Sequence, residues 1–506
     1  MYYDLKGNYF SGAYQLPPSK GPDSVEQFII RECPADVDTK LWECAIDYRH
    51  IEPALESAEA GFKVWRKIPV EGRIEFLRKY QEKVISRKEK IAEAIALETG
   101  KPLWEAHTEV SSVINKVTVT IEHALPRIKS QHIDEIFPNT KGHLYFKPLG
   151  PSLIIGPFNF PCHLPNGQIL SALIAGNSIV FKPSEKTCYS AQLLIECFHA
   201  AGFPSGVINL IQGDGEVARR LLKEKAIKGI YFTGSKEVGL KILEATHQDL
   251  SKLVALELGG KNTCILNKDI NINYTLGEMI KSSFISAGQR CVSTAIIAIH
   301  EDIKDEFISK FHELAKKIII DHPIQYENEP FMGPLIDQQS MENYLLYMGM
   351  AKREGIEEIM RGKQIERKFQ GNYVSPSIHL AERMDPSSHF LASEIFGPNS
   401  TFIPFSTIDE AIQIANMTEY GLATSLFTQD RNIYEHCLNE IDTGVLNFNR
   451  ATTGSSAMIP FGGVKNSGNY RPASIATIDS CVYSLCSLEM DAPKGGAIEK
   501  IKGLME

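Results

Sequence analysis

The stretch KGIYFTGSKEVGLKIL, Lys228 to Leu243, changes character halfway along its length. It is apolar and β-prone through Ile230 to Phe232, turns at Gly234 and Ser235, and resumes with apolar residues at helical spacing around Gly239. This order predicts a strand that passes through a tight turn into a helix. A glycine turn at a helix N-terminus offers free N–H groups to a phosphate, but many such turns need glycine for geometry alone.

Three neighbouring segments have the same strand-to-turn pattern, and runs of helical length lie between them. Strands that alternate with helices indicate a mainly parallel sheet with both faces covered, which is the doubly wound α/β class. The three segments are LGPSLIIGPF (149–158), NSIVFKPSE (177–185) and GVINLIQG (206–213).

A second series of β-prone segments begins near Leu256 and predicts a second α/β domain. Upstream of the first series, apolar positions recur at three- and four-residue steps from Ile51 to Leu97, with charged residues between them. That spacing predicts two or three amphipathic helices. The members of the second series are CILN (264–267), TAIIAIH (294–300), HFLASEIFGPNS (389–400) and TGVLNFN (443–449).

The composition favours a soluble protein that acts on a small molecule. The chain has 506 residues, of which 43% are hydrophobic, enough for two or three domains with cores of their own. A net charge of −9 and a pI near 5.9 give no basic surface for nucleic acid. The first residues lack a secretory signal pattern, and apolar stretches such as Gln168 to Phe181 are too short and interrupted to span a membrane. We therefore expect a cytoplasmic protein without nucleic-acid or membrane partners.

Cysteine and histidine spacing gives no sign of a metal site. The ten cysteines contain no CxxC pair and the fourteen histidines no HExxH motif, so neither a zinc site nor a disulfide framework is predicted. Cys291 nevertheless has an unusual context, because in FISAGQRCVST (284–294) it follows an apolar run and the polar turn of Gly288, Gln289 and Arg290. From this context alone, it is either a small buried hydrophobe or a nucleophile.

Lys182 and Glu185 in FKPSE follow a strand that should end near Phe181. Ligands of open α/β sheets bind beyond the carboxyl ends of the strands, so this cation and this carboxylate could hold the hydroxyls of a ribose. The alternative is a solvated surface pair.

Asn159 in GPFNFPCHLPNG (156–167) and Glu257 in ALELGGKN (255–262) each allow a catalytic and a structural interpretation. Prolines stiffen the loop around Asn159, so its amide could be an oxyanion donor, or it could cap its own turn. Glu257 lies in an apolar stretch, where burial would raise its pKa toward that of a general base unless it forms a structural salt bridge. Cys162, three residues after Asn159, is a rival thiol with no base or oxyanion donor near it in the sequence.

Together these residues could oxidise an aldehyde to an acid. That reaction needs a thiolate to attack the carbonyl, amides to hold the oxyanion, a nicotinamide to accept hydride and a base to activate water. Seven motifs carry a resemblance to the aldehyde dehydrogenase superfamily across nearly the whole chain. In chain order they are FNFP (158–161), FKPSE (181–185), FTGSKEVG (232–239), LELGGK (256–261), GQRC (288–291), EIFGP (394–398) and PFGGVKNSG (460–468).

The resemblance implies a role for each matching position. Cys291 would be the nucleophile, Glu257 the base for deacylation, and Asn159 with the backbone N–H of Cys291 the oxyanion hole. Some local stabilisation of the thiolate is expected, because a free thiol has a pKa of about 8.5. The implied cofactor residues are Lys182 and Glu185 for the adenosine ribose, Gly234, Ser235 and Gly239 for the pyrophosphate, and Glu394 and Phe396 for the nicotinamide ribose and ring.

Two of these residues also indicate the subclass. Branches of the superfamily that pass the acyl group to coenzyme A generally lack this glutamate, so Glu257 favours hydrolysis to a free acid. Glu185 favours NAD over NADP, because a carboxylate on the ribose hydroxyls would repel a 2′-phosphate. NADP is the weaker alternative.

A finer resemblance concerns the substrate. HLPNG (163–167) and SGNYRP (467–472) are similar to the branch of succinylglutamate semialdehyde dehydrogenases of arginine catabolism. TTGSS (452–456) resembles the loop with which glutamate semialdehyde dehydrogenases bind an α-carboxylate through backbone N–H groups, or is a glycine turn in the wall of the site. The implied ligands of a small anionic semialdehyde are Gly454, Ser455 and Ser293.

Other functions stay open from the sequence. A glutamate semialdehyde (pyrroline-5-carboxylate) dehydrogenase or a general aldehyde dehydrogenase is the nearest alternative. An esterase that uses the same acyl-enzyme without NAD, and a catalytically idle scaffold of the same fold, are more remote.

The resemblance also implies a domain organisation. Residues 1–123 and 147–256 would form the NAD-binding domain, and residues 257–449 the catalytic domain. Residues 124–146, which contain HLYFK, and 470–490, which contain CVYSLCSLEM, would form a small strand extension. An exposed strand of this kind pairs with a partner subunit, so we expect a homodimer or a dimer of dimers.

Overall fold

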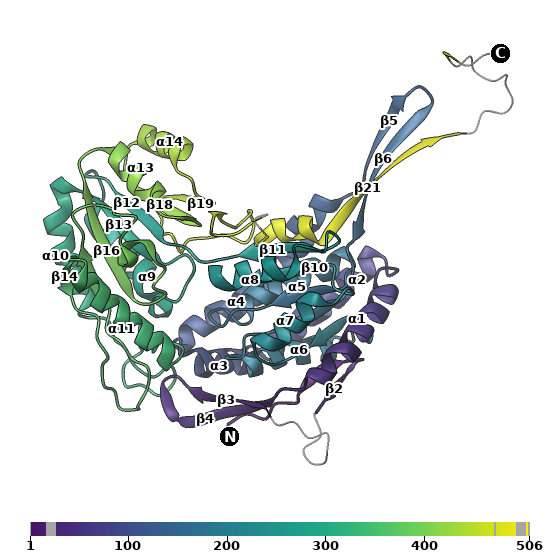
Figure 1. The fold of residues 1–506 in the computed structure, drawn as a ribbon, viewed down its shortest axis with the longest axis horizontal. Helices are drawn as coiled ribbons and strands as arrows, with labels where there is room; N and C mark the ends of the chain where they lie inside the picture. Colours follow the sequence, from purple (N-terminus) through teal and green to yellow (C-terminus); the bar gives the residue numbers. More distant parts are fainter. Residues whose placement is uncertain (1, 17–26, 470–471, 492–501, 504–506) are drawn as a thin grey trace.

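The computed structural model describes residues 2–16, 27–469, 472–491 and 502–503. Two seven-stranded sheets with helices packed on them form the body, and a three-stranded sheet projects from it (Figure 1). The predicted α/β class with two main sheets and a small β extension is confirmed.

The first sheet contains all four strand-to-turn segments of the first series. Five consecutive strands, from β11 to β9, are parallel, and an antiparallel hairpin near the N-terminus, which was not predicted, forms the other edge. Across the sheet the strands are β11 (Leu253–Glu257), β10 (Gly229–Thr233), β7 (Ser152–Ile155), β8 (Ile179–Lys182), β9 (Ile208–Leu210), β1 (Asn8–Phe10) and β2 (Ala13–Gln15).

The second sheet is parallel except at one edge, where the first two strands pair antiparallel. Across the sheet the strands are β14 (Glu357–Met360), β15 (Ser377–Leu380), β16 (Asn399–Phe405), β13 (Thr294–His300), β12 (Asn262–Leu266), β18 (Ala423–Phe427) and β19 (Val445–Phe448). β17 (Tyr420–Gly421) and β20 (Val464–Lys465) pair antiparallel as a separate two-stranded sheet.

One predicted strand segment is wrong. HFLASEIFGPNS contains no strand before Asn399, and its first residues form the short helix α12 (His389–Ala392). Ser388 caps this helix by accepting a hydrogen bond from the N–H of Leu391 at 3.0 Å. The helical turn buries Phe390 and Leu391, so the apolar residues that favoured a strand are buried by a helix instead.

The region from residue 51 to residue 99 forms three helices, in agreement with its periodicity. None of the helices in the described ranges is long and apolar enough to cross a membrane. The helices packed with the first sheet are α1 (Ile51–Trp65), α2 (Val70–Ser86), α3 (Lys88–Thr99), α4 (Leu103–Val119), α5 (His163–Ala175), α6 (Cys188–Ala200), α7 (Gly215–Lys223) and α8 (Lys236–Thr246). Those of the second half are α9 (Ile272–Phe284), α10 (Lys304–Ala315), α11 (Gln338–Arg353), α12, α13 (Ile408–Asn416) and α14 (Arg431–Glu440).

The projecting sheet joins distant parts of the chain. β6 (Thr140–Pro148) pairs antiparallel with β5 (Gln131–Phe137) on one side and with β21 (Val482–Met490) on the other (Figure 1). HLYFK and CVYSLCSLEM supply β6 and β21 as predicted strands, whereas residues 470–471 lie outside the described residues. A second hairpin, β3 (Phe28–Cys33) with β4 (Asp36–Ala45), was not predicted.

Candidate active site

The strand register brings several predicted site residues to one edge of the first sheet. Ile155 pairs with Lys182 on one side and with Phe232 on the other, and Thr233 pairs with Glu257. All these strands are parallel, so their carboxyl ends and the loops that follow them lie together.

Cys291 reaches this edge from the second half of the molecule, in the turn between α9 and β13. It is half-buried, whereas the rival Cys162 is fully buried, with its Sγ 3.7 Å from the carbonyl oxygen of Ser190. The position of Cys162 in the core is therefore that of a structural residue, and Cys291 is the thiol at the site.

The backbone before Cys291 has an unusual conformation. Ser286 and Ala287 both have positive φ, at 56° and 53°. Left-handed conformations cost free energy in residues other than glycine, so other contacts must hold them. The hydroxyl of Ser286 donates to the buried carboxylate of Glu105 on α4, and Arg290 Nη2 donates to the same carboxylate at 2.8 Å. Arg290 is thus a partner of Glu105, which stabilises the turn.

Asn262, the first residue of β12, holds the other side of the turn. Its Nδ2 donates to the carbonyl oxygens of Cys291 and Ser293, at 2.7 and 2.9 Å. This role of Asn262 was not predicted, although the residue directly follows the motif LELGGK. Through Asn262, the strand that follows Glu257 in the chain also orients the backbone of the nucleophile.

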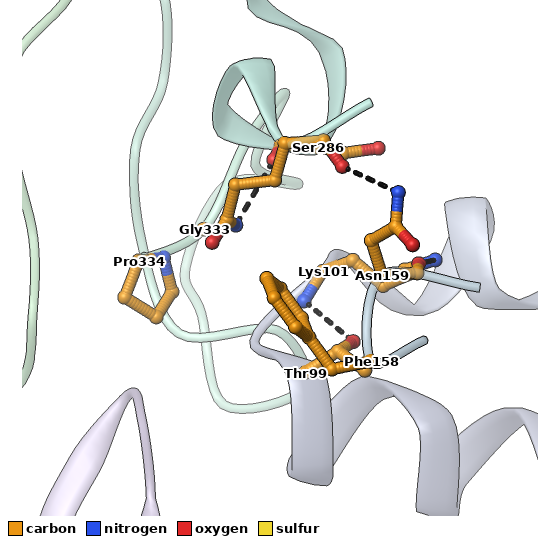
Figure 2. A pocket seen from close by; sticks show the side chains of 8 residues that line it. Thr99, Lys101, Phe158, Asn159, Ser286, Gly333 and Pro334 are labelled. Carbon is orange, nitrogen blue, oxygen red and sulfur yellow. Dashed lines mark hydrogen bonds between the residues drawn. The ribbon is translucent and has the colours of Figure 1, made fainter. Parts of the chain in front are cut away.

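The amide of Asn159 is locked in place. Its Nδ2 donates to the carbonyl oxygen of Gln289 at 3.0 Å, and its Oδ1 accepts from the N–H of Phe160 at 3.1 Å. Figure 2 shows the amide directed toward the segment that carries Ser286. An amide nitrogen has two hydrogens, so one remains for a second acceptor. Such a fixed donor is what an oxyanion hole requires.

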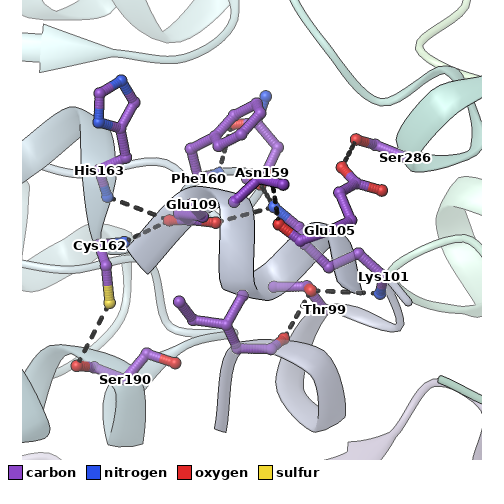
Figure 3. A network of polar contacts seen from close by, with 12 residues as sticks. Thr99, Lys101, Glu105, Glu109, Asn159, Phe160, Cys162, His163, Ser190 and Ser286 are labelled. Atoms are coloured by element: carbon purple, nitrogen blue, oxygen red, sulfur yellow. Dashed lines mark hydrogen bonds and ion pairs between the residues drawn. The ribbon is translucent and has the colours of Figure 1, made fainter. Parts of the chain in front are cut away.

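A buried ion pair supports the loop of Asn159. Lys101 Nζ donates to the carbonyl oxygen of Asn159 at 2.6 Å and lies 2.9 Å from Oε2 of Glu109. The other oxygen of Glu109 accepts from the N–H groups of Cys162 and His163, each at 3.0 Å (Figure 3). The stiffness of this loop thus comes from a charged network as well as from its prolines.

Helix α4 therefore contacts both halves of the site. Glu105 and Glu109 lie four residues apart, so they project from the same face. Glu105 holds the turn before the nucleophile, and Glu109 holds the loop of the oxyanion donor. Neither carboxylate was among the predicted site residues. Their burial distinguishes them from surface glutamates, and only the structure shows it.

The carboxyl group of Glu257 is enclosed, and its Oε1 has no hydrogen-bond partner among the described residues. Burial alone raises its pKa well above the usual value. The protonated form therefore persists toward neutral pH, and the carboxylate that forms above its pKa is a strong base. No salt bridge to Glu257 occurs in the described part of the chain, which removes the structural alternative considered from the sequence.

Burial, followed by the charges of Glu257 and Glu394, raises the pKa of the Cys291 thiol to about 12. Local stabilisation of the thiolate was expected, and the raised pKa contradicts that expectation. The positive charge of Arg290 and the backbone N–H of Cys291 itself lower this pKa, but by less. The resting site therefore holds a thiol.

The pH dependence of alkylation tests this result. We expect iodoacetamide to label Cys291 at a rate that rises about tenfold per pH unit between about pH 7 and pH 10, because only the thiolate reacts and its fraction stays small below the pKa. Mass spectrometry of peptides separates this site from the exposed Cys486, which serves as the reference. A plateau of the Cys291 rate below about pH 9 would contradict a raised pKa.

Lys182 and Glu185 lie at the carboxyl end of β8, with Lys182 Nζ 3.7 Å from the Glu185 carboxylate. Lys182 is buried and also donates to the carbonyl oxygen of Pro183 at 2.8 Å, whereas Glu185 is partly exposed. An ammonium has three N–H groups, so it retains a donor for a hydroxyl. The pair is not a solvated surface pair, because its cation is enclosed.

The turn after β10 presents the N-terminus of α8. Ser235 caps this helix by accepting from the N–H of Val238 at 3.4 Å. Gly239 lies one turn further, where a Cβ would come within 2.8 Å of Leu258. Gly239 therefore allows α8 to pack closely on Leu258, directly after β11, whereas Gly234 and Ser235 are the residues at the helix N-terminus.

Glu394 and Phe396 lie on the opposite wall. Glu394 accepts from the N–H of Gly260 at 3.1 Å, and a Cβ at Gly259 would lie 1.8 Å from its carboxylate. Burial raises the pKa of Glu394 to about 7. Phe396, at a φ of 52°, makes an edge-to-face contact with Phe158 at a centroid distance of 5.9 Å.

The three residues predicted to bind the substrate differ in whether their hydrogen-bond donors are free. Ser293 Oγ is enclosed without a hydrogen-bond partner in the described residues. The N–H groups of Gly454 and Ser455 already donate within their loop, to Ala451 at 3.0 Å and to Thr453 at 3.1 Å. A carboxylate would have to replace these two hydrogen bonds to bind there.

The sequence of the chain is similar to those of known aldehyde dehydrogenases. The model of the aldehyde dehydrogenase family matches residues 22–484. An N-succinylglutamate 5-semialdehyde dehydrogenase of Novosphingobium aromaticivorans is 37% identical over 447 residues, which cover 88% of this chain and 93% of that protein. A protein of the same name from Legionella pneumophila is also 37% identical, over 89% of this chain and 90% of its own.

Solved structures show the same fold. The 1-pyrroline-5-carboxylate dehydrogenase from Thermus with bound NAD has a TM-score of 0.87 and 26% identity, covering 96% of this chain and 93% of that one. The betaine aldehyde dehydrogenase of Staphylococcus aureus in complex with NAD⁺ has a TM-score of 0.90 and 26% identity, covering 98% and 97%. The resemblance carried by the seven motifs is thereby confirmed, and this chain belongs to the aldehyde dehydrogenase family.

Proposed function

We propose that the protein is an NAD-dependent dehydrogenase that oxidises N-succinylglutamate 5-semialdehyde to N-succinylglutamate, a step of arginine catabolism. The observation that carries the chemistry is the meeting of a half-buried thiol, Cys291, with the enclosed and unpartnered carboxyl of Glu257 and the fixed amide of Asn159. The names of the relatives from Novosphingobium and Legionella support the substrate.

In this proposal Cys291 forms a covalent bond to the aldehyde carbon. The thiol releases its proton to solvent as its sulfur attacks the carbonyl carbon, and the resulting oxyanion accepts hydrogen bonds from Asn159 Nδ2 and the N–H of Cys291. Loss of a hydride from this carbon turns the thiohemiacetal into a thioester, and bound NAD would supply the hydride acceptor. Glu257 then removes a proton from water, which attacks the thioester and releases the acid and the thiol.

The chemistry of the predicted cofactor residues fits NAD. The enclosed ammonium of Lys182 and the carboxylate of Glu185 offer a donor and an acceptor to the adenosine ribose. The helix N-terminus capped by Ser235 suits a pyrophosphate, since its first N–H groups face outward. Glu394, held against the glycine pair that follows Glu257, would bind the nicotinamide ribose.

Residues in the wall of the site near Cys291 support the proposal of an anionic substrate. Ser293 has an enclosed hydroxyl without a partner, two residues after the nucleophile. Gly454 and Ser455 would bind the α-carboxylate through their backbone N–H groups after their loop reorganises. Glutamate semialdehyde is the second candidate substrate, because it carries the same α-carboxylate and the Thermus neighbour is a 1-pyrroline-5-carboxylate dehydrogenase.

We also infer an assembly and a division into domains. Residues 1–123 and 147–256 are proposed to bind NAD and residues 257–449 to carry the nucleophile. The extension of residues 124–146 and 470–490 is proposed to join subunits in a homodimer or a dimer of dimers, through the projecting sheet of β5, β6 and β21. Exposed apolar side chains on this sheet support the inference, namely those of Ile133, Phe137, Tyr483, Leu488 and Met490.

A substrate panel tests the function. NADH formation is measured with N-succinylglutamate semialdehyde, glutamate semialdehyde, succinate semialdehyde and propanal, each with NAD and with NADP. We expect kcat/KM for N-succinylglutamate semialdehyde to exceed that for each of the other substrates by about tenfold or more. One additional charged contact contributes a free energy of this size. NAD should be preferred, and Glu185→Gln should narrow the preference, because it removes the charge that repels a 2′-phosphate. If propanal leads the panel, the substrate assignment is wrong.

A further inference from the structure

A buried lysine on α4 has no assigned role. Lys116 is 4% exposed, and its side chain forms no ion pair or hydrogen bond in the described part of the chain. Burial lowers its pKa to about 8. A buried cation without a partner destabilises the fold, so such a residue is retained where it serves a ligand.

Lys116 lies on the face of α4 that supports the site. It is seven residues after Glu109, which places both side chains on the same face, two turns or about 10 Å apart. Across from it, a Cβ at Gly167 on α5 would lie 3.1 Å from Cε and 3.8 Å from Nζ of Lys116. The absence of a side chain at Gly167 leaves room for the ammonium group.

His163 connects this lysine with the oxyanion loop. It lies four residues before Gly167 on α5, so both face the same side. Its ring is 6.3 Å from that of Phe160, and Figure 3 shows the two rings on the same side of Glu109. His163 Nδ1 is enclosed without a hydrogen-bond partner among the described residues. Burial, together with the charges of Lys116 and Lys101, lowers the pKa of His163 to about 4, so the ring is neutral.

We propose that Lys116, assisted by His163, binds the carboxylate of the substrate that is farthest from the aldehyde. Three bonds of an extended chain span about 3.5 Å, so the eight bonds from the aldehyde carbon to the succinyl carboxylate of N-succinylglutamate semialdehyde reach about 9 Å. This is close to the rise of about 10 Å along α4 between Lys116 and Glu109, whose carboxylate holds the N–H groups that follow the oxyanion loop. The α-carboxylate, only four bonds from the aldehyde carbon, is too close. The inference rests on the proposed function and adds a specificity residue to it.

A matched substrate pair tests the subsite. N-acetylglutamate semialdehyde keeps the aldehyde, the α-carboxylate and the amide, but has a methyl group in place of the distal carboxylate arm. In Lys116→Met, kcat/KM for the succinyl substrate should fall by about ten- to a hundredfold, and that for the acetyl substrate should change by less than about threefold. The loss should appear mainly in KM, because the contact is the same in the bound substrate and in the transition state.

Two control variants accompany this experiment. Lys116→Arg keeps the charge and should retain most of the preference for the succinyl substrate. Lys225→Met removes an exposed lysine that precedes β10, at the end of this strand away from the site, and should leave kcat/KM for both substrates unchanged. Equal losses for both substrates in Lys116→Met would show a structural role and overturn the proposal.

A binding measurement separates this inference from the proposed function. N-succinylglutamate, the product, should raise the melting temperature of the native protein and should fail to do so in Lys116→Met, whether or not turnover occurs. A native protein that oxidises both substrates equally well would overturn the subsite while leaving the dehydrogenase intact. A native protein that oxidises neither substrate contradicts the proposed function, and the melting experiment then decides the subsite alone.

Discussion

Replacing Cys291 by alanine is expected to abolish aldehyde-dependent NADH formation, with kcat/KM lower by at least about 10,000-fold. The alanine side chain cannot form the covalent bond from which hydride leaves, and the rival Cys162 is enclosed in the core. The measurement is NADH absorbance in the presence of NAD and the semialdehyde, at enzyme concentrations high enough to detect the residual rate.

Two controls make this result specific for the nucleophile. Cys291→Ala should keep the melting temperature and the NAD affinity of the native protein, since a half-buried thiol contributes little to the core. Cys162→Ala should keep most of the activity and should lower the melting temperature, because it leaves a small cavity at a fully buried position. Activity that survives in Cys291→Ala but disappears in Cys162→Ala would reverse the assignment of the nucleophile.

The fold was predictable where local pattern and tertiary structure agree. The four strand-to-turn units ending in Phe158, Glu185, Gly213 and Ser235 all form strands of one sheet, because short apolar runs bounded by glycine or proline have few other uses. The N-terminal hairpin of β1 and β2 was missed, since three-residue strands carry almost no periodic signal. Residues 389–392 were assigned incorrectly because a short buried helix and a buried strand have similar composition.

Site residues that lie in sequence motifs could be predicted. Contacts between segments that are distant in the sequence could not. Glu105 and Arg290 are 185 residues apart in sequence, and no spacing rule links them. The same holds for Lys101 and the carbonyl oxygen of Asn159. These contacts arise only when α4 packs between the loops of the two halves, which is a consequence of the complete fold.

The pKa of Cys291 shows a related limit. A nucleophilic cysteine is usually expected to have a stabilised thiolate, yet two carboxyl groups and burial act in the opposite direction here. Glu257 and Glu394 are 34 and 103 residues from Cys291 in the chain, so their shared environment is invisible in the sequence. The protonation state of the thiol therefore follows from contacts that only the complete fold brings together.

Replacing Glu257 by glutamine is expected to leave the first chemical step largely intact and to slow hydrolysis of the thioester, lowering steady-state kcat by about 100- to 10,000-fold. The amide keeps the shape of the carboxyl group but cannot accept a proton from water. Rapid mixing should then show a burst of about one NADH per active site, followed by a slow steady state. Intact-protein mass spectrometry should detect the acyl group on Cys291.

The pH profile and a second variant separate deacylation from cofactor binding. In the native protein kcat should rise with pH as Glu257, whose pKa is raised by burial, loses its proton, and this rise should be absent in Glu257→Gln. Glu394→Gln removes the carboxylate proposed to bind the nicotinamide ribose, so it should reduce the burst itself. If Glu257→Gln shows no burst and no acyl-enzyme, Glu257 acts before hydride transfer, and the unpartnered carboxyl beside Cys291 serves to deprotonate the thiol instead of water.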